Sequence, residues 1–318
     1  MAGVTDLAYR MICREYDSDV MLATEMLSSK SLSYAHLNQK RFDHSRRMEI
    51  PKDDNLTGVQ LFGHEPDVMY DAAKIATESG AKFIDINMGC PVAKIVNGMD
   101  GAALMKEPQL ARDIVRSVIK ATHLPVTVKT RLGWCQQTLN APEFCKGLVG
   151  EGAQALTIHG RTRSQKYMGS ANWELIAKVV DAVDVPVFAN GDIKTVHDAR
   201  KALETTGAAG LAIARATMGK PWFSKQVNHF LRTGEELPEP NFNEKLDLAI
   251  KHCKKLIELK GEYIGIQESR RHISNYTTGM YGAADLRKRV NVAENFEQAV
   301  EAIEELRQSI KSCPYKPK

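Results

Sequence analysis

Short apolar segments alternate with longer amphipathic segments over the first two-thirds of the chain. The short segments match β-strands in length and in their content of β-branched residues; they are Val20–Thr24, Thr57–Leu61, Phe83–Asn87, Val126–Lys129, Ala155–Ile158, Val187–Ala189 and Leu211–Ala214. The longer segments carry apolar residues at helical spacing; they are Leu7–Glu15, Pro66–Ser79, Pro108–Ala121, Ala141–Gly150, Trp173–Ala182 and Val196–Thr205. Such alternation predicts parallel strands joined by right-handed crossovers, an α/β fold.

The number of strands favours a (β/α)8 TIM barrel, which needs eight strands where seven are visible. We therefore expect the first barrel strand to precede Met1, so that this sequence begins just after it. A seven-stranded or open sheet is the alternative.

The pattern changes after the last predicted strand. A polar, proline-containing linker is predicted over 234–242, and only helical spacing follows it, over Leu246–Leu259, Gln267–Thr277 and Phe296–Ile310. The sequence thus predicts a barrel over 1–233 and a small all-α domain over 243–318.

The net charge and the cysteine content restrict the possible classes of binding partner only slightly. The chain has 318 residues, a net charge of +4 and six cysteines. Without a CxxC or zinc-ligand spacing, we expect no metal and a reducing, cytoplasmic location. No apolar run is long enough for a membrane helix. Basic residues gather at Arg270, Arg271, Arg287, Lys288 and Arg289, which fits either an anionic partner or a solvated helix face.

Polar residues follow successive predicted strands, where barrel enzymes carry their chemistry. They are Gln60, Asn87, Cys90, Lys129, Arg131, His159, Arg161, Asn190, Asp192 and Arg215. Gly191 and Arg215 fit a phosphate grip after the last two strands, because glycine permits close backbone approach and arginine binds phosphate through two donors. Lys129 fits a holder of negative charge, a salt-bridged rim lysine or a Schiff-base lysine.

Three residues can be interpreted in more than one way. Cys90 lies in a Gly-Cys-Pro turn that can aim its thiol into the barrel mouth as a general acid, or it is a small buried hydrophobe. His159 either binds an oxygen of a ligand or is a core histidine. Tyr167, in a long loop, could stack on a base. The other cysteines, at 13, 135, 145, 253 and 313, are interpreted as structural.

Five spaced motifs together resemble the signatures of the tRNA-dihydrouridine synthase family. They are Met1-Ala-Gly-Val-Thr-Asp6, Asp85-Ile-Asn-Met-Gly-Cys-Pro91, Val128-Lys-Thr-Arg-Leu-Gly-Trp134, Leu156-Thr-Ile-His-Gly-Arg-Thr-Arg163 and Ala189-Asn-Gly-Asp-Ile193. The Asn-Met-Gly-Cys-Pro form, with Gly219-Lys-Pro-Trp222, is most similar to the bacterial B-type branch.

The resemblance implies an enzyme that uses FMN, with NADPH as reductant, to reduce the C5=C6 bond of a uridine in the tRNA D-loop. Reduced flavin N5 would deliver hydride to C6 and Cys90 would protonate C5. The FMN contacts that it implies are Met1, Ala2, Gln60, Lys129, His159, Asn190, Gly191, Asp192, Ala214 and Arg215. The substrate contacts are Asn87, Arg131, Arg161, Tyr167 and the five basic residues of the helical domain, which would clamp tRNA phosphates.

One position departs from the family pattern, since Ala214-Arg215-Ala216 stands where glycine is usual. If that position needs a positive φ, alanine costs about 1 kcal/mol and weakens FMN binding. Two rival functions remain open. One is another flavin barrel acting on a small molecule, similar to a dihydroorotate dehydrogenase or an ene-reductase. The other is a non-catalytic tRNA-binding protein.

Overall fold

The computed structural model describes residues 1–37 and 47–312. The chain forms two compact units. The first contains residues 1–7 and 19–214, and the second contains residues 8–18 and those from Arg215 onward.

The first unit is built on one parallel sheet whose seven strands follow one another in chain order. The strands are β1 (Leu22–Ser28), β2 (Thr57–Phe62), β3 (Ile84–Asn87), β4 (Val126–Arg131), β5 (Ala155–His159), β6 (Val187–Asn190) and β7 (Gly210–Ala212). The α/β class and the parallel pairing predicted from the sequence are confirmed. Strand β1 runs four residues past its predicted end, because Glu25 interrupts the apolar run without ending the strand.

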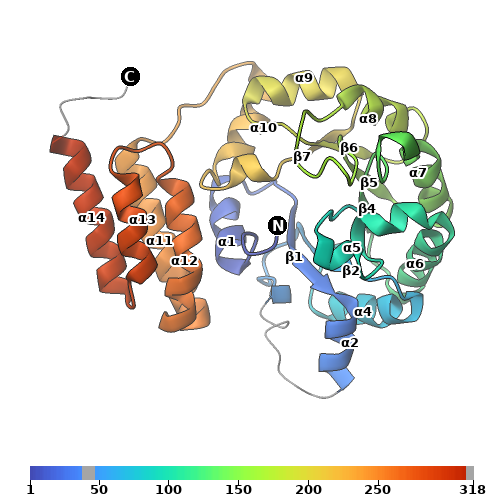
Figure 1. Ribbon diagram of the computed structural model, residues 1–318, viewed down its shortest axis with the longest axis horizontal. Coiled ribbons are helices and arrows are strands. Elements are labelled where there is room, and N and C mark those ends of the chain that lie inside the picture. The colour runs from blue at the N-terminus through green and yellow to red at the C-terminus, as the bar shows by residue number, and fades with distance from the viewer. Residues whose placement is uncertain (38–46, 313–318) are drawn as a thin grey trace. The chain divides into compact units, whose positions relative to one another are not determined.

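Helices line the outer side of the curled sheet (Figure 1). They are α2 (Ser29–Leu37), α4 (Pro66–Glu78), α6 (Pro108–Ala121), α7 (Ala141–Gly150), α8 (Trp173–Val180) and α9 (Val196–Thr206). The short helix α5 (Ala93–Val96) and a 3-10 turn at Gly101–Lys106 lie in the connection between β3 and α6, and a second 3-10 turn, at Gln136–Thr138, follows β4. Alternate strand residues such as Val59, Ile86, Val128 and Ile158 are buried in one core with apolar residues of these helices. Burial of that strand face leaves the other face of each strand for polar side chains.

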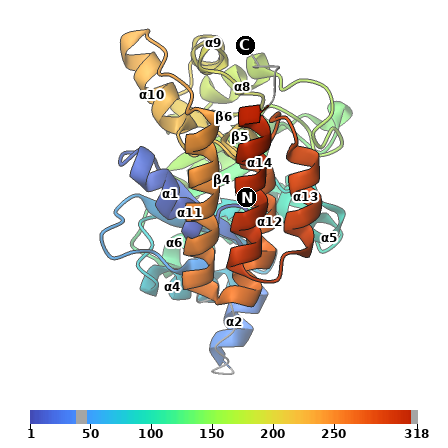
Figure 2. The same cartoon turned by 90° about the vertical axis from the view of Figure 1, so that its left-hand side faces the viewer.

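The second unit is helical. Helix α10 spans Phe223–Thr233, after a 3-10 turn at Arg215–Thr217, and α1 (Leu7–Tyr16) contributes residues 8–16. Helices α11 (Phe242–Lys260), α12 (Glu262–Tyr276), α13 (Ala283–Val292) and α14 (Phe296–Ser312) lie side by side (Figure 2). The helical pattern after the linker is confirmed, but α10 and α13 were not predicted. Helix α13 buries only Ala283, Leu286 and Val290, too few apolar positions for a clear periodic signal.

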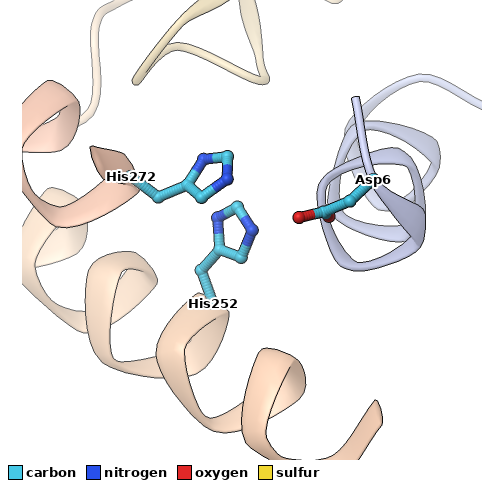
Figure 3. A group of neighbouring side chains, drawn as sticks. All are labelled: Asp6, His252 and His272. Atoms are coloured by element: carbon cyan, nitrogen blue, oxygen red, sulfur yellow. The ribbon is translucent and has the colours of Figure 1, made fainter. Parts of the chain in front are cut away.

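A buried polar cluster lies inside the helical unit. The rings of His252 and His272 are 4.0 Å apart between centroids (Figure 3). Tyr9 stacks on His272 at 5.8 Å, and the hydroxyl of Tyr276 lies 3.1 Å from Nδ1 of His252. Burial raises the pKa of Tyr9 well above its usual value. These rings pack α11 and α12 together as the apolar residues around them do.

In the part of the chain that the structure describes, no helix has the length and apolar content needed to cross a membrane.

Candidate functional site

Polar side chains occupy one face of the sheet. Their positions alternate with the buried apolar positions, so they share the face opposite the helices. Strand register aligns them in three rows, and the last row stands nearest the carboxyl ends. The rows are Gln60–Asp85–Thr127, Asn87–Lys129–Thr157 and Arg131–His159–Asn190.

The first row is joined by hydrogen bonds that begin at a buried carboxyl. Asp85 accepts from Nε2 of Gln60 at 2.6 Å and from the hydroxyl of Thr127 at 2.7 Å. Burial raises the pKa of Asp85, and these two hydrogen bonds oppose the rise. Oε1 of Gln60 in turn accepts from the amide of Asn87 at 2.9 Å. The carboxyl therefore sets the orientation of both amides.

Lys129 is the cation of the second row, and the register pairs it with Asn87. Burial lowers the pKa of Lys129 to about 8, and the charge of Arg131 adds to the decrease. Asp85 and Cys90 act in the opposite direction. An ammonium with this pKa is protonated at pH 7 and can titrate just above it.

Cys90 lies in a turn whose shape does not depend on its thiol. Oδ1 of Asn87 accepts from the backbone N–H groups of Gly89 and Cys90 at 3.1 and 2.9 Å. The carbonyl of Cys90 accepts from the N–H of Ala102 at 3.1 Å. A Cβ on Gly101 would lie 2.9 Å from that carbonyl, so the close approach needs glycine.

A histidine from the neighbouring loop supports the same segment. Nδ1 of His64, which follows β2, lies 2.8 Å from Oδ1 of Asp100. Asp100 precedes the glycine that contacts the Cys90 carbonyl. The turn that carries the thiol is thus fixed at both of its ends.

Two buried guanidinium groups hold the loops at the carboxyl ends of the strands. Arg131 is 2% exposed and donates to the carbonyls of Gly89, Thr162 and Lys166. It also lies 5.8 Å from the ring centroid of Tyr167, whose side chain is 51% exposed. Arg131 therefore links the Cys90 turn to the loop that bears Tyr167.

The second guanidinium, of Arg161, is also 2% exposed. It donates to the carbonyls of Met168 and Gly169 and to Oδ2 of Asp192 at 2.6 Å. The same oxygen accepts from the N–H of Ala171, and hydrogen bonds with that amide and with Arg161 lower the pKa of Asp192 against its burial. Asp192 adopts φ +57°, so this ion pair holds a strained backbone position.

His159 and Asn190 complete the third row. Nη1 of Arg161 lies 3.4 Å from Nε2 of His159. A guanidinium only donates, so Nε2 is the acceptor and we assign the ring proton to Nδ1. The amide of Asn190 donates to the carbonyl of Ala212 at 2.6 Å, which ties β6 to β7.

Gly191 follows Asn190 with φ +119° in a position that no side chain fits. A Cβ there would lie 2.8 Å from Cβ of Ala171 and 2.9 Å from Cδ2 of His159. We expect Gly191→Ala to destabilise the protein by about 1–3 kcal/mol, measured by thermal unfolding. Gly150→Ala is the matched control, because a Cβ at Gly150 meets nothing within 4 Å. Equal melting temperatures for the two variants would contradict this prediction.

The remaining predicted cofactor residues lie at the start of the chain and after β7. The carbonyl of Met1 accepts from the N–H groups of Val4 and Thr5, and Ala2 is exposed. Among the described residues, positive φ outside glycine occurs at Met99, Lys166 and Asp192. Ala214 therefore lacks the positive φ on which its predicted cost depended. Arg215 begins the longer of the two segments that form the second unit.

The geometry can be compared with known families. The family model described as dihydrouridine synthase matches residues 1–312. The chain belongs to the dihydrouridine synthase family.

Relatives of this family cover nearly the whole chain. A probable tRNA-dihydrouridine synthase of Rickettsia bellii is 41% identical over 92% of this chain and 88% of its own length. A tRNA-dihydrouridine synthase B of Pseudomonas syringae is 38% identical over 93% of this chain and 86% of its own length. One with the same name from Vibrio cholerae is 36% identical over 96% and 92%. The family resemblance stated from the motifs is thus confirmed, including its likeness to B-type proteins.

The dihydrouridine synthase motifs mark most of the polar face but omit some of its supports. Thr127, His64 and Asp100 hold the Asp85 and Cys90 segments, and no strand-end rule points to them. The motif Asp85–Pro91 contains Asp85, but the family resemblance implies no role for this residue. Its position in the middle of an apolar strand was the signal that could have singled it out, because a buried carboxylate needs partners.

The predicted basic cluster of the helical unit is partly neutralised. Lys288 pairs with Asp285 at 3.0 Å, and Arg289 pairs with Glu301 and Glu305. Arg270 is half-buried and donates to the carbonyl of Ala293. Arg271 and Arg287 are exposed. Arg271 lies on α12 and Arg287 on α13.

The five cysteines in the described part of the chain, Cys13, Cys90, Cys135, Cys145 and Cys253, form no disulfide. Burial raises the pKa values of Cys13 and Cys145 to about 12 and also raises that of Cys253, which suits inert core thiols. Hydrogen bonding by Thr138 lowers the pKa of the partly exposed Cys135. Cys313 lies outside the described residues.

Proposed function

We propose that this protein is a tRNA-dihydrouridine synthase, which reduces the C5=C6 bond of a uridine in the tRNA D-loop with FMN as cofactor and NADPH as reductant. The observation that carries the proposal is the pairing of Asn87 with Lys129 beside the Cys90 turn, on the polar face of a dihydrouridine synthase sheet. That face presents an acid, a cation and oriented amides at one end of the strands.

The chemistry of the polar face fits FMN. Lys129 and Gln60 would contact the isoalloxazine, because a cation and an amide match the N1–C2=O edge of a reduced flavin. His159, Asn190 and the backbone at Gly191 would hold the ribityl phosphate end, where the glycine leaves room for close approach. The cofactor when bound supplies the hydride for C6 of the uracil. The contacts predicted for Met1, Ala2, Asp192, Ala214 and Arg215 remain part of this proposal.

Cys90 is the proposed general acid. Its thiol donates a proton to C5 of the uracil as C6 is reduced, and the thiolate is later reprotonated from solvent. Asn87 orients the turn through the N–H groups of Gly89 and Cys90. Its Oδ1 is engaged there, so a direct contact of Asn87 with the base would use its Nδ2 group, which donates to Gln60 at 2.9 Å.

Tyr167 is the proposed contact for the extruded base, because its ring is half exposed and rests near Arg131. A uracil must leave its stack to reach a site at strand ends. Arg131 and Arg161, both engaged by carbonyl groups, would act by holding the loops around the base.

The proposal divides the chain into a catalytic barrel over 1–233, a linker over 234–242 and a tRNA-binding domain over 243–318. The helical domain would bind tRNA phosphates. Arg271, Arg287 and Lys288 are the exposed candidates, whereas Arg270 and Arg289 are partly buried. A cytoplasmic location belongs to the same proposal, since tRNA is the substrate.

Mapping of dihydrouridine by mass spectrometry tests the function. tRNA from a strain lacking the gene should lack dihydrouridine at one D-loop position, and the purified protein with FMN and NADPH should restore it there. Turnover of dihydroorotate or a small enone with unreduced tRNA would instead favour the small-molecule flavin enzyme. A protein that binds tRNA but takes up no flavin, and so stays colourless, would favour the non-catalytic alternative.

A further inference from the structure

Trp134 lies between two cations that come from two other loops. Nζ of Lys106 is 4.8 Å from the indole centroid, and the guanidinium carbon of Arg163 is 4.4 Å from it. Lys106 follows β3, Trp134 follows β4 and Arg163 follows β5. Three successive connections at the carboxyl end of the sheet therefore converge on one aromatic ring, which we call the Trp134 cluster.

The backbone beneath this cluster is well fixed. The N–H groups of Arg163 and Ser164 donate to the carbonyls of Gly133 and Trp134, each at 2.9 Å. A Cβ on Gly133 would lie 2.4 Å from the carbonyl oxygen of Thr138, so the tight loop needs glycine there. Such a frame holds the indole and the guanidinium in place before any ligand arrives, which lowers the entropic cost of binding.

The charges of the cluster are not neutralised within the described chain. Neither Lys106 nor Arg163 forms an ion pair with a described carboxylate. The buried Nε–H of Arg163 donates to no acceptor among the described residues. By contrast, the neighbouring guanidinium groups of Arg131 and Arg161 are engaged by carbonyls and by Asp192. An arginine that stacks on an indole keeps its terminal donors directed outward, where they match a phosphate.

We propose that the Trp134 cluster binds a phosphodiester of the substrate tRNA beside the nucleotide that enters the site. This rests on the proposed function. Tyr167 and Met168, which are 51% and 71% exposed, follow Arg163 in the same loop, so the cluster adjoins the proposed base contact. Phosphate contacts fix the register of a nucleic acid on a protein, and here they would set which nucleotide faces Tyr167.

Binding of unmodified tRNA to the holoenzyme tests the inference, measured by filter binding at several salt concentrations. The double variant K106Q/R163Q should weaken tRNA binding about 5–30-fold near physiological salt and reduce the slope of log K against log salt by about 1–2. W134L should weaken binding about 3–10-fold, because both cations lose their support. K120Q/K178Q is the matched control, with the same change of charge at exposed lysines in the last turns of α6 and α8.

Further measurements separate a phosphate-binding role of the cluster from a structural one. The single variant R163Q should also lose tRNA affinity, and R163K should recover most of that loss, because lysine restores the positive charge. In K106Q/R163Q, the flavin content and the rate of NADPH-driven flavin reduction without tRNA should equal those of the wild type. The KM of this variant for tRNA should rise with little change in kcat. A wild type that binds tRNA but forms no dihydrouridine would remove the proposed function while leaving the affinity comparison intact.

Three outcomes would overturn the inference. One is tRNA affinity in K106Q/R163Q equal to that of K120Q/K178Q. Another is a raised KM for NADPH with unchanged tRNA affinity, which would assign the cations to the reductant. The last is an equal loss of affinity in R163K and R163Q together with a lower melting temperature, which would mark a purely structural role.

Discussion

Cys90→Ala is expected to slow uracil reduction about 10²–10⁴-fold while FMN and tRNA binding persist. The thiol is the proposed proton donor, and nothing in the turn depends on it. Backbone groups of Cys90 bond to Asn87 and Ala102, so alanine should keep the same conformation. Single-turnover reduction of tRNA by prereduced enzyme measures the proton-transfer step directly, apart from the reaction with NADPH.

Cys145→Ala is the matched control for this prediction. Cys145 is buried in α7, and burial raises the pKa of its thiol to about 12. Its loss should lower stability modestly without changing the rate. Cys90→Ser should slow uracil reduction about as much as Cys90→Ala does, because a hydroxyl is a much weaker acid than a thiol. A Cys90→Ala variant that reduces tRNA at the wild-type rate would exclude Cys90 from the chemistry.

Lys129→Met is expected to weaken the binding of reduced FMN about 10–100-fold at pH 7, the usual contribution of a hydrogen bond to a charged group. In the wild-type protein, burial lowers the pKa of Lys129 to about 8. The ammonium is therefore about half present near pH 8, predominates at lower pH and is lost as the pH rises. Affinity for the anionic reduced flavin should be constant below that pH and should fall above it, until the pKa of the complex is reached.

Two comparisons isolate the lysine in this titration. Oxidised FMN, whose ring is neutral, should show a smaller dependence on pH over the same range. Lys129→Met should bind reduced FMN with no inflection near pH 8. An inflection of the same size in the variant would assign the titration to another group, and equal affinities of the two proteins would remove Lys129 from the flavin site.

The periodicity of the sequence predicted the seven strands and five of the helices of the first unit, α4, α6, α7, α8 and α9, because each strand buries one face against helices. The helices α2 and α5 were not predicted. Helices α6 and α7 begin and end where predicted, with proline in the first turn of each. The end of β1 was predicted too early, because the charged Glu25 lies inside the strand and a charged residue usually indicates that an apolar strand has ended. Helix α13 was missed because it buries only three apolar residues, too few for helical spacing to be recognised.

The position of a side chain at a strand end was easier to predict than its partners. The substrate contacts of Arg131 and Arg161 stay a prediction, whereas their bonds to backbone carbonyls of the Cys90 turn and of the loop after β5 were not predicted. Carbonyl partners depend on how loops fold back in three dimensions, and residue type alone does not report that. The same limit concealed the pairing of His64 with Asp100, which joins two different loops.

The three hydrogen bonds of Arg131 connect the Cys90 turn directly to the loop of Tyr167. A substitution that shifts one segment must strain the same guanidinium that steadies the other. Substitutions in these two segments should therefore have non-additive effects on the protein. Adaptation to a different RNA sequence around the target nucleotide would then proceed by compensating pairs of substitutions, one in each segment, rather than by single ones.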